Sequence, residues 1–541
     1  MTTQQSEAVP EDGPSVDLGK PADEFEQRPH REVRLVMIGL VITMLLAMLD
    51  NLIVGTAMPT IVGELNGAEH MSWVVTAYTL ATAASTPIWG KVGDLYGRKG
   101  SFLVSIAIFL LGSALSGMAQ TMTQLIAFRA VQGLGAGGLM VGVMSIMGAL
   151  VLPRDRGKYQ GMFAAVMALA TIGGPLIGGF ITDHLNWRWT FYVNLPLGAI
   201  ALIFIVVVLK LPKVRSNAKI DYLGAALLTI GIVSMVLITT WGGHEYAWSS
   251  KQILGLGALS VASIIGFCYV EQRVAEPILP LKLFRNRNFT MVSIIGFIVG
   301  FAMFGAVTFL PTYQQIVQGA SATNSGLLLM PMMFGMLVIS LVVGQAITKT
   351  GKYRIYPIIG TVVMGGGSLL LSTLSVDTTS FASSCYMVVL GAGMGFLMQV
   401  TMLVAQNSVE MKDMGVASSS ATLFRTIGGS FGVALFGTLY INQVNKSVEK
   451  LPPEVLQHMQ QGGGSAEGMS AMNPATLSKL PADVLSAYQH GISNGMHTVF
   501  LWGAVISLVA VAASLFLREV KLRGGADAAE AKAEAALEGA M

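Results

Sequence analysis

Two charged side chains lie inside long apolar segments, and one of them, a carboxylate, has the chemistry to carry a proton. Asp50 lies within the apolar segment 35–62, and Arg129 lies within the apolar segment 122–151. A carboxylate in the middle of a membrane-spanning helix costs about 2.5–3.5 kcal/mol on insertion scales, so it must be paired, protonated or in contact with water. A carboxylate that alternates between these states is a proton carrier, whereas one that stays beside an arginine only fixes helix packing. The sequence is compatible with both interpretations.

The two residues are expected to lie at a similar depth. Arg129 is about 7 residues and Asp50 about 10–12 residues from the outer ends of their segments, which corresponds to roughly 10–18 Å at 1.5 Å per residue. An arginine side chain is long enough to cover the remaining difference. We therefore predict that Asp50 and Arg129 form the proton-coupling pair.

A third charged residue, Arg425, also lies within an apolar segment, 413–441. The predicted membrane interior then holds one carboxylate and two guanidinium groups. We expect a neutral, monocationic, zwitterionic or anionic amphipathic substrate in preference to a dication, which would require further carboxylates. Arg425 is a candidate substrate contact, with helix packing as its alternative role. The other candidate substrate contacts are Tyr78, Gln314 and Met398.

The composition places these residues in a lipid bilayer. Of the 541 residues, 53% are apolar and 12% are charged, which is about half the charged fraction of an ordinary soluble domain. A chain of soluble domains is therefore excluded, and the formal net charge of +3 gives no reason to expect a nucleic acid as partner. Cys268 and Cys385 both lie in apolar runs, so we expect neither a disulfide framework nor a metal site.

Fourteen segments are apolar and long enough to cross a bilayer, which takes about 20 residues. Their approximate bounds are 35–62, 71–90, 101–119, 122–151, 158–182, 187–209, 222–242, 252–271, 289–313, 324–347, 354–375, 380–406, 413–441 and 494–517. Short cytoplasmic loops retain Lys and Arg, and here these residues follow the even-numbered spans or flank the first and last spans. The short loops on the other side hold only Arg188 and Lys251. This asymmetry predicts that both termini are cytoplasmic.

The parts outside the spans are polar. The first 32 residues lack an apolar core, so we expect a disordered tail without a cleaved signal peptide. An external segment, 442–493, contains two apolar-periodic pieces, near Pro453 to Met459 and Leu477 to Tyr488. Short amphipathic helices and a tolerated loop insertion are both open interpretations of this segment. The last 18 residues, rich in Ala and Glu, have the composition of a short helix.

Two loops of the chain resemble each other. The loop GKVGDLYGRK, from Gly90 to Lys99, aligns with GQAITKTGKYR, from Gly344 to Arg354, at an offset of 254 residues. Each follows the second helix of a six-helix block if spans 1–6 and 9–14 are equivalent. Internal repeats are typical of alternating-access transporters, so we interpret spans 7 and 8 as an insertion between two repeats.

Several motifs together resemble those of the major facilitator superfamily, in its fourteen-span drug:proton antiporter branch. The relevant segments are GKVGDLYGRK, LIAFRAVQGLGAGG from Leu125 to Gly138, GGPLIGG from Gly173 to Gly179, LDNLIVGTAMP from Leu49 to Pro59, NWRWTFYVNLPLG from Asn186 to Gly198, LFRNRNF from Leu283 to Phe289 and FRTIGGSFG from Phe424 to Gly432. They occur in the same order as in the family. The resemblance implies a multidrug efflux antiporter that contributes to antibiotic resistance.

The first of these motifs is expected to gate the inner side. Gly90, Gly97 and Arg98 shape a tight basic turn, and the Asp94 carboxylate could lie against the start of the predicted span 413–441, where helix amides point toward the cytoplasm. The resemblance implies that this contact is a latch between the two halves. Thr348 replaces the carboxylate in the second copy, so we expect a one-sided latch.

The glycine-rich fifth-span motif is the second expected gating element. Gly174, Gly178 and Gly179 remove side chains, and Pro175 removes a backbone hydrogen bond, so the helix is expected to kink and to allow another backbone to approach. The resemblance implies a tight seal at the interface of the two halves.

We therefore predict an all-α polytopic membrane protein with the major facilitator fold and fourteen transmembrane helices. Residues 1–32 form the N-terminal tail, 33–212 a six-helix bundle, 213–287 two inserted helices and a linker, 288–517 the second six-helix bundle, and 518–541 the C-terminal tail.

The predicted function is proton-coupled export of amphipathic small molecules or drugs by alternating access. The lack of a Walker motif argues against ATP as energy source, and we expect no cofactor, no enzyme activity and a monomer in a prokaryotic-type cytoplasmic membrane. An exporter dedicated to one metabolite, such as an antibiotic, siderophore, amino acid or lipid, is the main alternative. A channel or a polytopic membrane enzyme fits less well, because the histidines are scattered and the chain is built from two repeats.

Overall fold

Helices form nearly all of the protein, and every predicted span corresponds to a helix. The computed structural model describes residues 30–65, 70–151, 156–209, 220–243, 245–320, 329–448, 482–520 and 522. Within these ranges the only β-structure is a single bridge between Gly242 and Tyr246. Residues 30–32 of the predicted disordered N-terminal tail form the start of α1, whereas residues 1–29, most of the predicted C-terminal tail and the piece near Pro453 to Met459 lie outside the described residues.

The helices fall into two groups with two helices between them. The N-terminal group contains α1 (His30–Leu65), α2 (Met71–Tyr96), α3 (Arg98–Met118), α4 (Met122–Leu150), α5 (Arg156–His184), the short α6 (Trp189–Tyr192) and α7 (Asn194–Val208). The connecting helices are α8 (Tyr222–Trp241) and α9 (Lys251–Glu271). The C-terminal group contains α10 (Arg287–Ile316), α12 (Met330–Thr350), α13 (Ile355–Ser372), α14 (Ser380–Asn407), α15 (Met414–Val448) and α19 (Ala482–Leu515).

Twelve of the described helical segments are long and apolar enough to cross a membrane. The helices α2 and α15 reach the necessary length but are more polar, because Thr and Ser recur along both of them. A helix of this composition is expected to turn part of its surface away from lipid and toward other helices or a cavity.

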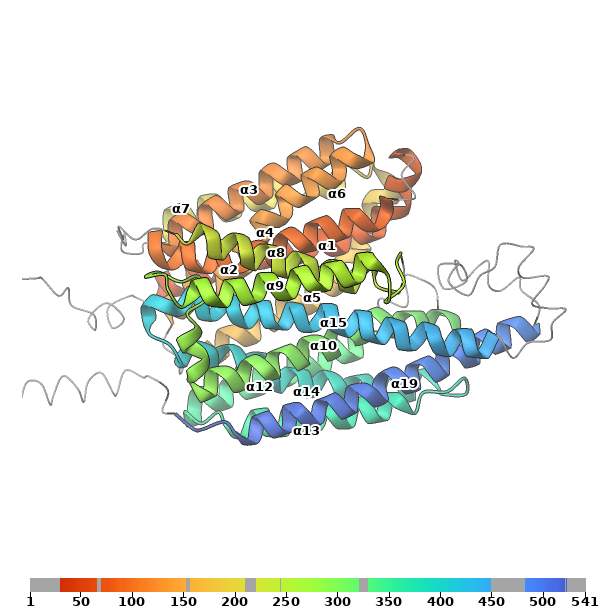
Figure 1. Cartoon of the computed structure of the whole chain (residues 1–541). Coiled ribbons are helices and arrows are strands. Elements are labelled where there is room, and N and C mark those ends of the chain that lie inside the picture. Colours follow the sequence, from red (N-terminus) through yellow and green to blue (C-terminus); the bar gives the residue numbers. More distant parts are fainter. Residues whose placement is uncertain are drawn as a thin grey trace, which may run out of the picture.

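The last two long helices extend beyond the predicted spans. The helix α15 continues to Val448, and α19 already begins at Ala482, whereas the predicted spans end at 441 and begin at 494. From Ala482 onward the piece from Leu477 to Tyr488 belongs to α19, so neither a separate short helix nor a loop insertion describes these residues. Figure 1 shows α15 and α19 projecting beyond the other helices at one end of the bundle.

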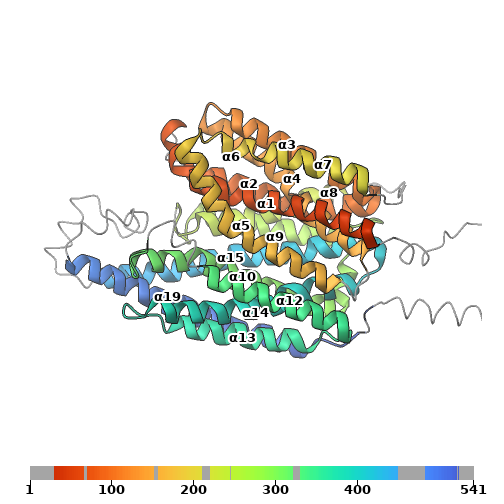
Figure 2. The same ribbon diagram turned by 180° about the vertical axis from the view of Figure 1, so that it is seen from behind.

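The same helix pairs form in both groups. In the N-terminal group α4 packs against α2 and α3, and α1 packs against α5 and α7. In the C-terminal group α14 packs against α12 and α13, and α10 packs against α15 and α19. The groups meet through α2 with α15 and through α5 with α12. Figure 1 shows the groups as two layers with α8 and α9 along their boundary, and Figure 2 shows α5 and α12 on the reverse side.

The two similar loops both contain a glycine with positive φ, although the ψ values of these glycines differ. Gly97 between α2 and α3 has φ of 101°, and Gly351 between α12 and α13 has φ of 69°. Only glycine adopts such positive φ values readily, which explains why both loop copies carry a glycine there. Both loops lie at the end of the bundle where α1 begins and α19 ends (Figures 1 and 2). We call this end, which is predicted to be cytoplasmic, the inner end.

Candidate functional site

Asp50 and Arg129 form a fully buried ion pair between α1 and α4. The Nη1 atom of Arg129 lies 2.6 Å from Oδ2 of Asp50, and neither side chain has exposed surface. The predicted contact between these residues is therefore confirmed, whereas their role in proton coupling stays a prediction. Both residues of the pair belong to the N-terminal group, so their charges compensate each other without a residue of the C-terminal group.

Two amide side chains complete the surroundings of the Asp50 carboxylate. Gln132 Nε2 and Asn194 Nδ2 each donate a hydrogen bond to Asp50 Oδ1 at 2.7 Å. Asn194 Nδ2 also donates to Ser113 Oγ at 2.9 Å. Both carboxylate oxygens thus act as acceptors, as is expected of an ionised group, and the network joins α1, α3, α4 and α7.

Arg129 is held by further groups around its guanidinium. Its Nη1 donates to Gln132 Oε1 at 2.8 Å and its Nη2 donates to Asn51 Oδ1 at 3.3 Å. The guanidinium carbon lies 4.1 Å from the ring centroid of Tyr78, which is a cation–π distance. Tyr78 therefore supports the ion pair because its ring faces Arg129 in this structure, and its contact with substrate stays a prediction.

Asp94 joins the two groups at the inner end. Its carboxylate accepts hydrogen bonds from the backbone N–H of Gly415 at 3.0 Å and of Val416 at 2.9 Å, in the first turn of α15. Arg98 Nη2 lies 3.1 Å from Asp94 Oδ1. Burial raises the pKa of Asp94 to about 6, against the lowering effects of Arg98 and the two amides. The predicted position of this carboxylate at the start of α15 is confirmed.

Gly90 allows the backbones of α2 and α15 to touch beside Asp94. A Cβ atom at Gly90 would lie 2.7 Å from the carbonyl oxygen of Gly415 and would also collide with Ser419. A Cβ atom at Gly415 would lie 2.5 Å from the carbonyl oxygen of Gly90. Both positions therefore require glycine for this contact to form.

Arg156 makes a second contact between the groups at the inner end. It is 1% exposed, and its Nη1 donates to Gln406 Oε1 of α14 at 3.3 Å. Gln406 Nε2 in turn donates to the carbonyl oxygen of Met144 at 3.2 Å and to Ser418 Oγ at 3.0 Å. This contact was not predicted from the sequence, because the partner of Arg156 lies 250 positions further along the chain.

Lys91 links α2 to the segment that follows α9. Its Nζ lies 2.7 Å from Glu276 Oε2, and the lysine side chain is 6% exposed. Lys91 is therefore a buried ion-pair partner, and it does not only anchor a charged turn at the lipid headgroups. This contact connects the two additional helices α8 and α9 to the inner end.

The glycines of the fifth-span motif pack within the N-terminal group. A Cβ atom at Gly174 would lie 2.5 Å from the Leu52 side chain, and one at Gly178 would lie 2.9 Å from the carbonyl oxygen of Ile53. Both neighbours belong to α1, so these glycines do not form the predicted seal between the two groups. Gly179 has open space around its Cα, and the side chain of Pro175 lies outside the described residues.

A cavity of about 210 Å³ lies between the two groups. Four helices of each group line it: α1, α2, α4 and α5 on one side, and α10, α12, α14 and α15 on the other. Its lining contains eight methionines together with Phe163 and Phe304, and the polar lining includes Thr82, Thr86, Ser340, Gln399, Thr422, Arg425 and Thr426. The polar residues of α2 and α15 thus face this space, which explains the lower hydropathy of these two helices.

Two of the predicted substrate contacts line the cavity and one lies elsewhere. Met398 and Arg425 both belong to the lining. Gln314 is completely buried, and its Nε2 lies 3.7 Å from the sulfur of Met387, so it packs between α10 and α14. Gln314 therefore does not line this cavity, because the sequence did not reveal which face of α10 is turned toward the cavity, and its contact with substrate stays a prediction.

The described residues contain no group of three His, Cys, Asp or Glu side chains that could hold a metal ion. Cys268 and Cys385 are both free in this part of the chain. The site thus consists of a buried ion pair, contacts that close the inner end and a cavity between the groups.

Comparison with known proteins identifies the family. Residues 40–433 match the Major Facilitator Superfamily. The chain is 40% identical to the multidrug transporter protein MdtP of Bacillus subtilis over 90% of this chain and 93% of that protein. It is 36% identical to multidrug resistance protein 3 of the same species, over 91% of this chain and 97% of that protein.

A solved structure shows the same fold at much lower identity. The human organic anion transporter MFSD10 aligns with a TM-score of 0.61 at 13% identity, over 90% of this chain and all of that chain. This likeness concerns the helix arrangement alone. Together with the family match, the paired six-helix groups and the cavity between them, it leads to one conclusion. The chain is a polytopic membrane transporter, not an enzyme, and it belongs to the Major Facilitator Superfamily.

Proposed function

We propose that this protein exports amphipathic small molecules in exchange for protons by alternating access. The proposal depends chiefly on one observation, the buried Asp50–Arg129 pair inside the N-terminal group. The relatives named as a multidrug transporter and a multidrug resistance protein support export of drugs. In this proposal the protein lies in the cytoplasmic membrane with both termini in the cytoplasm. It acts as a monomer and uses the proton gradient instead of ATP.

Proton binding at Asp50 is the step that couples to movement. A proton that enters from outside converts the carboxylate to a carboxylic acid and removes the negative charge that Arg129 faces. A buried cation without its counter-ion is strongly unfavourable, so Arg129 shifts toward Gln132, Asn51 and the Tyr78 ring, which already surround it. Release of the proton to the cytoplasm restores the ion pair and completes the cycle.

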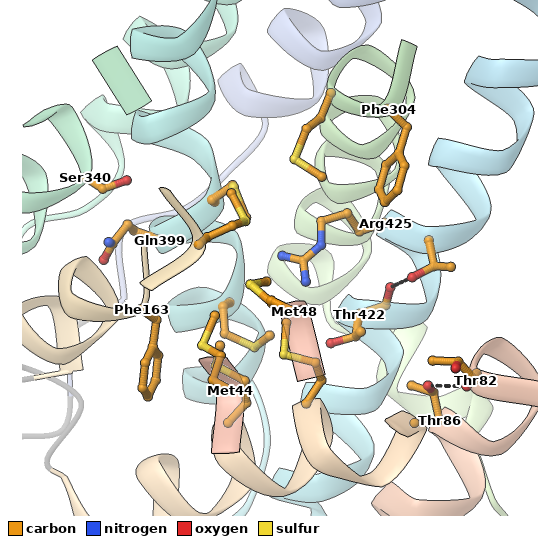
Figure 3. Close-up of a pocket in the computed structure, with 18 residues that line it drawn as sticks. Met44, Met48, Thr82, Thr86, Phe163, Phe304, Ser340, Gln399, Thr422 and Arg425 are labelled. Atoms are coloured by element: carbon orange, nitrogen blue, oxygen red, sulfur yellow. Dashed lines mark hydrogen bonds between the residues drawn. The ribbon is translucent and has the colours of Figure 1, made fainter. Parts of the chain in front are cut away.

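The helix α1 transmits this change to the cavity. Met48 lines the cavity, and Asp50 lies two residues further along the same helix. At about 3.6 residues per turn, two residues apart point to nearly opposite faces of a helix. A rotation or tilt of α1 that follows protonation of Asp50 therefore also moves Met44 and Met48, which lie in the cavity wall (Figure 3).

The inner contacts act as the cytoplasmic gate. In this conformation Asp94 caps α15, Gly90 touches Gly415, and Arg156 reaches Gln406. We propose that substrate enters when these contacts open and leaves outward when they close. The moving units are 33–212 and 288–517, with 213–287 inserted between them; the repeated pattern of helix pairs supports this division.

The close approach at Gly90 gives a test of the gate. Gly90→Val adds a side chain where a Cβ already collides with Gly415 and Ser419. Overpacking costs about 1–3 kcal/mol, so we expect closure of the inner end to be disfavoured by roughly 10- to 100-fold and transport to fall accordingly. Gly100→Val is the matched control, because nothing lies within 4 Å of a Cβ at Gly100.

The state of the gate can be read with a cavity cysteine. Thr86→Cys in a background without Cys268 and Cys385 places a thiol in the cavity wall. In Gly90→Val this thiol should react faster with a membrane-impermeant reagent applied from the cytoplasmic side than in Gly100→Val. Equal reactivity in the two variants, with normal transport in both, would argue against a gate at Gly90.

Efflux assays in inverted membrane vesicles test the proposed function. Vesicles that contain the protein should accumulate amphipathic dyes and drugs when a proton gradient is imposed, and a proton ionophore should abolish the accumulation. ATP supplied together with the ionophore should not restore it. Accumulation that persists with the ionophore and depends on ATP would exclude proton-driven export.

A further inference from the structure

We propose that Arg425 binds an anionic group of the substrate, so that the cavity prefers amphipathic compounds with one carboxylate, sulfonate or phosphate beside an apolar body. This inference depends on the proposed export function and specifies its substrate class. The Arg425 guanidinium belongs to the lining of an otherwise mostly apolar cavity.

The backbone around Arg425 is held firmly in place. A Cβ atom at Gly300 of α10 would collide with the carbonyl oxygen of Arg425, and one at Gly432 of α15 would lie 2.4 Å from the carbonyl oxygen of Phe301. The helices α10 and α15 therefore pack backbone to backbone beside this residue. From this fixed position the Arg425 side chain extends into the cavity, as Figure 3 shows.

Arg425 has no counter-ion in the cavity. Among the described residues that line the cavity, it is the only charged side chain, and none of the described residues forms a hydrogen bond or ion pair with its guanidinium. Arg129, by contrast, contacts a carboxylate, two amide oxygens and an aromatic ring. An uncompensated cation at membrane depth is unfavourable unless it faces water or an anion, so an anionic solute would stabilise it.

Gln399 provides a second polar group for the same solute. It is 4% exposed, and its Oε1 has no hydrogen-bond partner among the described residues. Gln399 of α14 and Arg425 of α15 both line the cavity, and Figure 3 shows them on opposite sides of it, with methionines between them. Because the two ends of a glutamine amide can exchange places by rotation, Gln399 can present its N–H₂ group to an anion.

The rest of the cavity suits an apolar body. Eight methionines line it together with Phe163 and Phe304, and methionine adapts its shape and makes favourable contacts with aromatic rings. An apolar cavity of about 150 Å³ binds benzene in another protein. The volume of about 210 Å³ therefore fits a compact aromatic body in this conformation.

These features predict an order of affinities for compounds of equal shape. A carboxylate gains charge-assisted hydrogen bonds from the five N–H donors of arginine. A neutral amide gains weaker hydrogen bonds, and an ammonium group is repelled by the guanidinium. Hydrogen bonds to charged groups are worth enough to change affinity about 10- to 100-fold.

Three naphthalene compounds test this order. Naphthylacetate, naphthylacetamide and naphthylethylammonium share one ring system and differ in charge. Their binding to the full-length protein in lipid nanodiscs, with empty nanodiscs subtracted, should be tightest for naphthylacetate by about 10-fold or more over the amide. Arg425→Gln should remove this preference, and Arg425→Lys should retain part of it because the positive charge remains.

The matched control is a substitution in the same cavity wall that leaves Arg425 in place. Met303→Leu alters the cavity wall without changing charge, so it should affect the three compounds similarly. Binding of naphthylacetamide to Arg425→Gln shows that the variant is folded. Equal affinities for the three compounds, no binding of naphthylacetate, or an unchanged preference in Arg425→Gln would overturn the inference. Proton-driven export of drugs by the wild type in inverted vesicles, measured separately, would still stand in that case.

Discussion

Replacing Asp50 with asparagine should abolish uphill, proton-driven efflux while the protein still inserts into the membrane. Asparagine has nearly the same shape as aspartate, but it cannot take up and release a proton. If protonation of Asp50 couples the gradient to transport, accumulation in inverted vesicles should fall to the level of vesicles without the protein. Asp50→Glu, which keeps an ionisable group, should retain part of the activity.

The asparagine variant should keep the movements that need no proton exchange. Its side chain imitates the protonated state of residue 50, which the proposed cycle passes through, and the cavity itself is unchanged. We therefore expect exchange of labelled for unlabelled substrate across the membrane without a net gradient to continue. Undiminished uphill efflux in Asp50→Asn would exclude Asp50 as the proton carrier, and loss of both reactions would show a structural defect.

Replacement of Arg129, the positively charged partner of Asp50, should have the second largest effect on stability and uphill efflux. Arg129→Gln leaves the Asp50 carboxylate buried without its counter-ion, and loss of one partner of a buried pair lowers the free energy of unfolding by about 3–5 kcal/mol. The double variant Asp50→Asn with Arg129→Gln removes both charges and should regain most of this stability without regaining proton coupling. Thermal unfolding in detergent and uphill efflux measure the two properties separately.

A matched arginine–carboxylate pair on the outer side serves as control. Arg188 Nη1 lies 2.6 Å from Glu64 Oε1, but the two side chains are 27% and 45% exposed. Exposed pairs contribute about 0–1 kcal/mol, so Arg188→Gln should change the thermal midpoint far less than Arg129→Gln. Similar losses in both variants, or no recovery in the double variant, would contradict a special role of the buried pair.

The sequence indicated the ion pair because charge is so rare in the predicted spans. Asp50 and Arg129 could be placed at similar depth by counting residues along their helices, and an arginine side chain is long. Gln132 and Asn194 were not predicted as partners of Asp50, because amides in apolar helices have many possible roles. The three-residue spacing between Arg129 and Gln132 puts them on one helix face and is the signal that was missed.

The sequence could not predict which helix faces are turned toward the cavity. Tyr78 and Gln314 lie in helices that line the cavity. The Tyr78 ring, however, faces Arg129, and the Gln314 side chain packs against Met387. Helices that are apolar on all sides show little periodicity, so the side turned toward the cavity cannot be read from them. The loop glycines Gly97 and Gly351 were easier to interpret, because a positive φ value requires glycine.

Contacts between distant parts of the chain were predicted only where a motif pointed to them. The position of Asp94 at the start of α15 followed from the loop motif and from the amides at a helix N-terminus. The contact of Arg156 with Gln406 had no such signal, since a basic residue near a cytoplasmic loop is common. The packing of Gly174 and Gly178 on α1 similarly shows that a glycine cluster predicts a close approach without naming the partner helix.

Simultaneous measurement of proton and substrate movement tests the central claim most directly. The purified protein is placed in liposomes that contain a pH-sensitive dye and no ATP, and a gradient of a transported drug is imposed. We predict that drug flux drives protons in the opposite direction, and that Asp50→Asn shows no such proton movement. Drug flux without proton movement, or protons moving in the same direction as the drug, would contradict proton-coupled export.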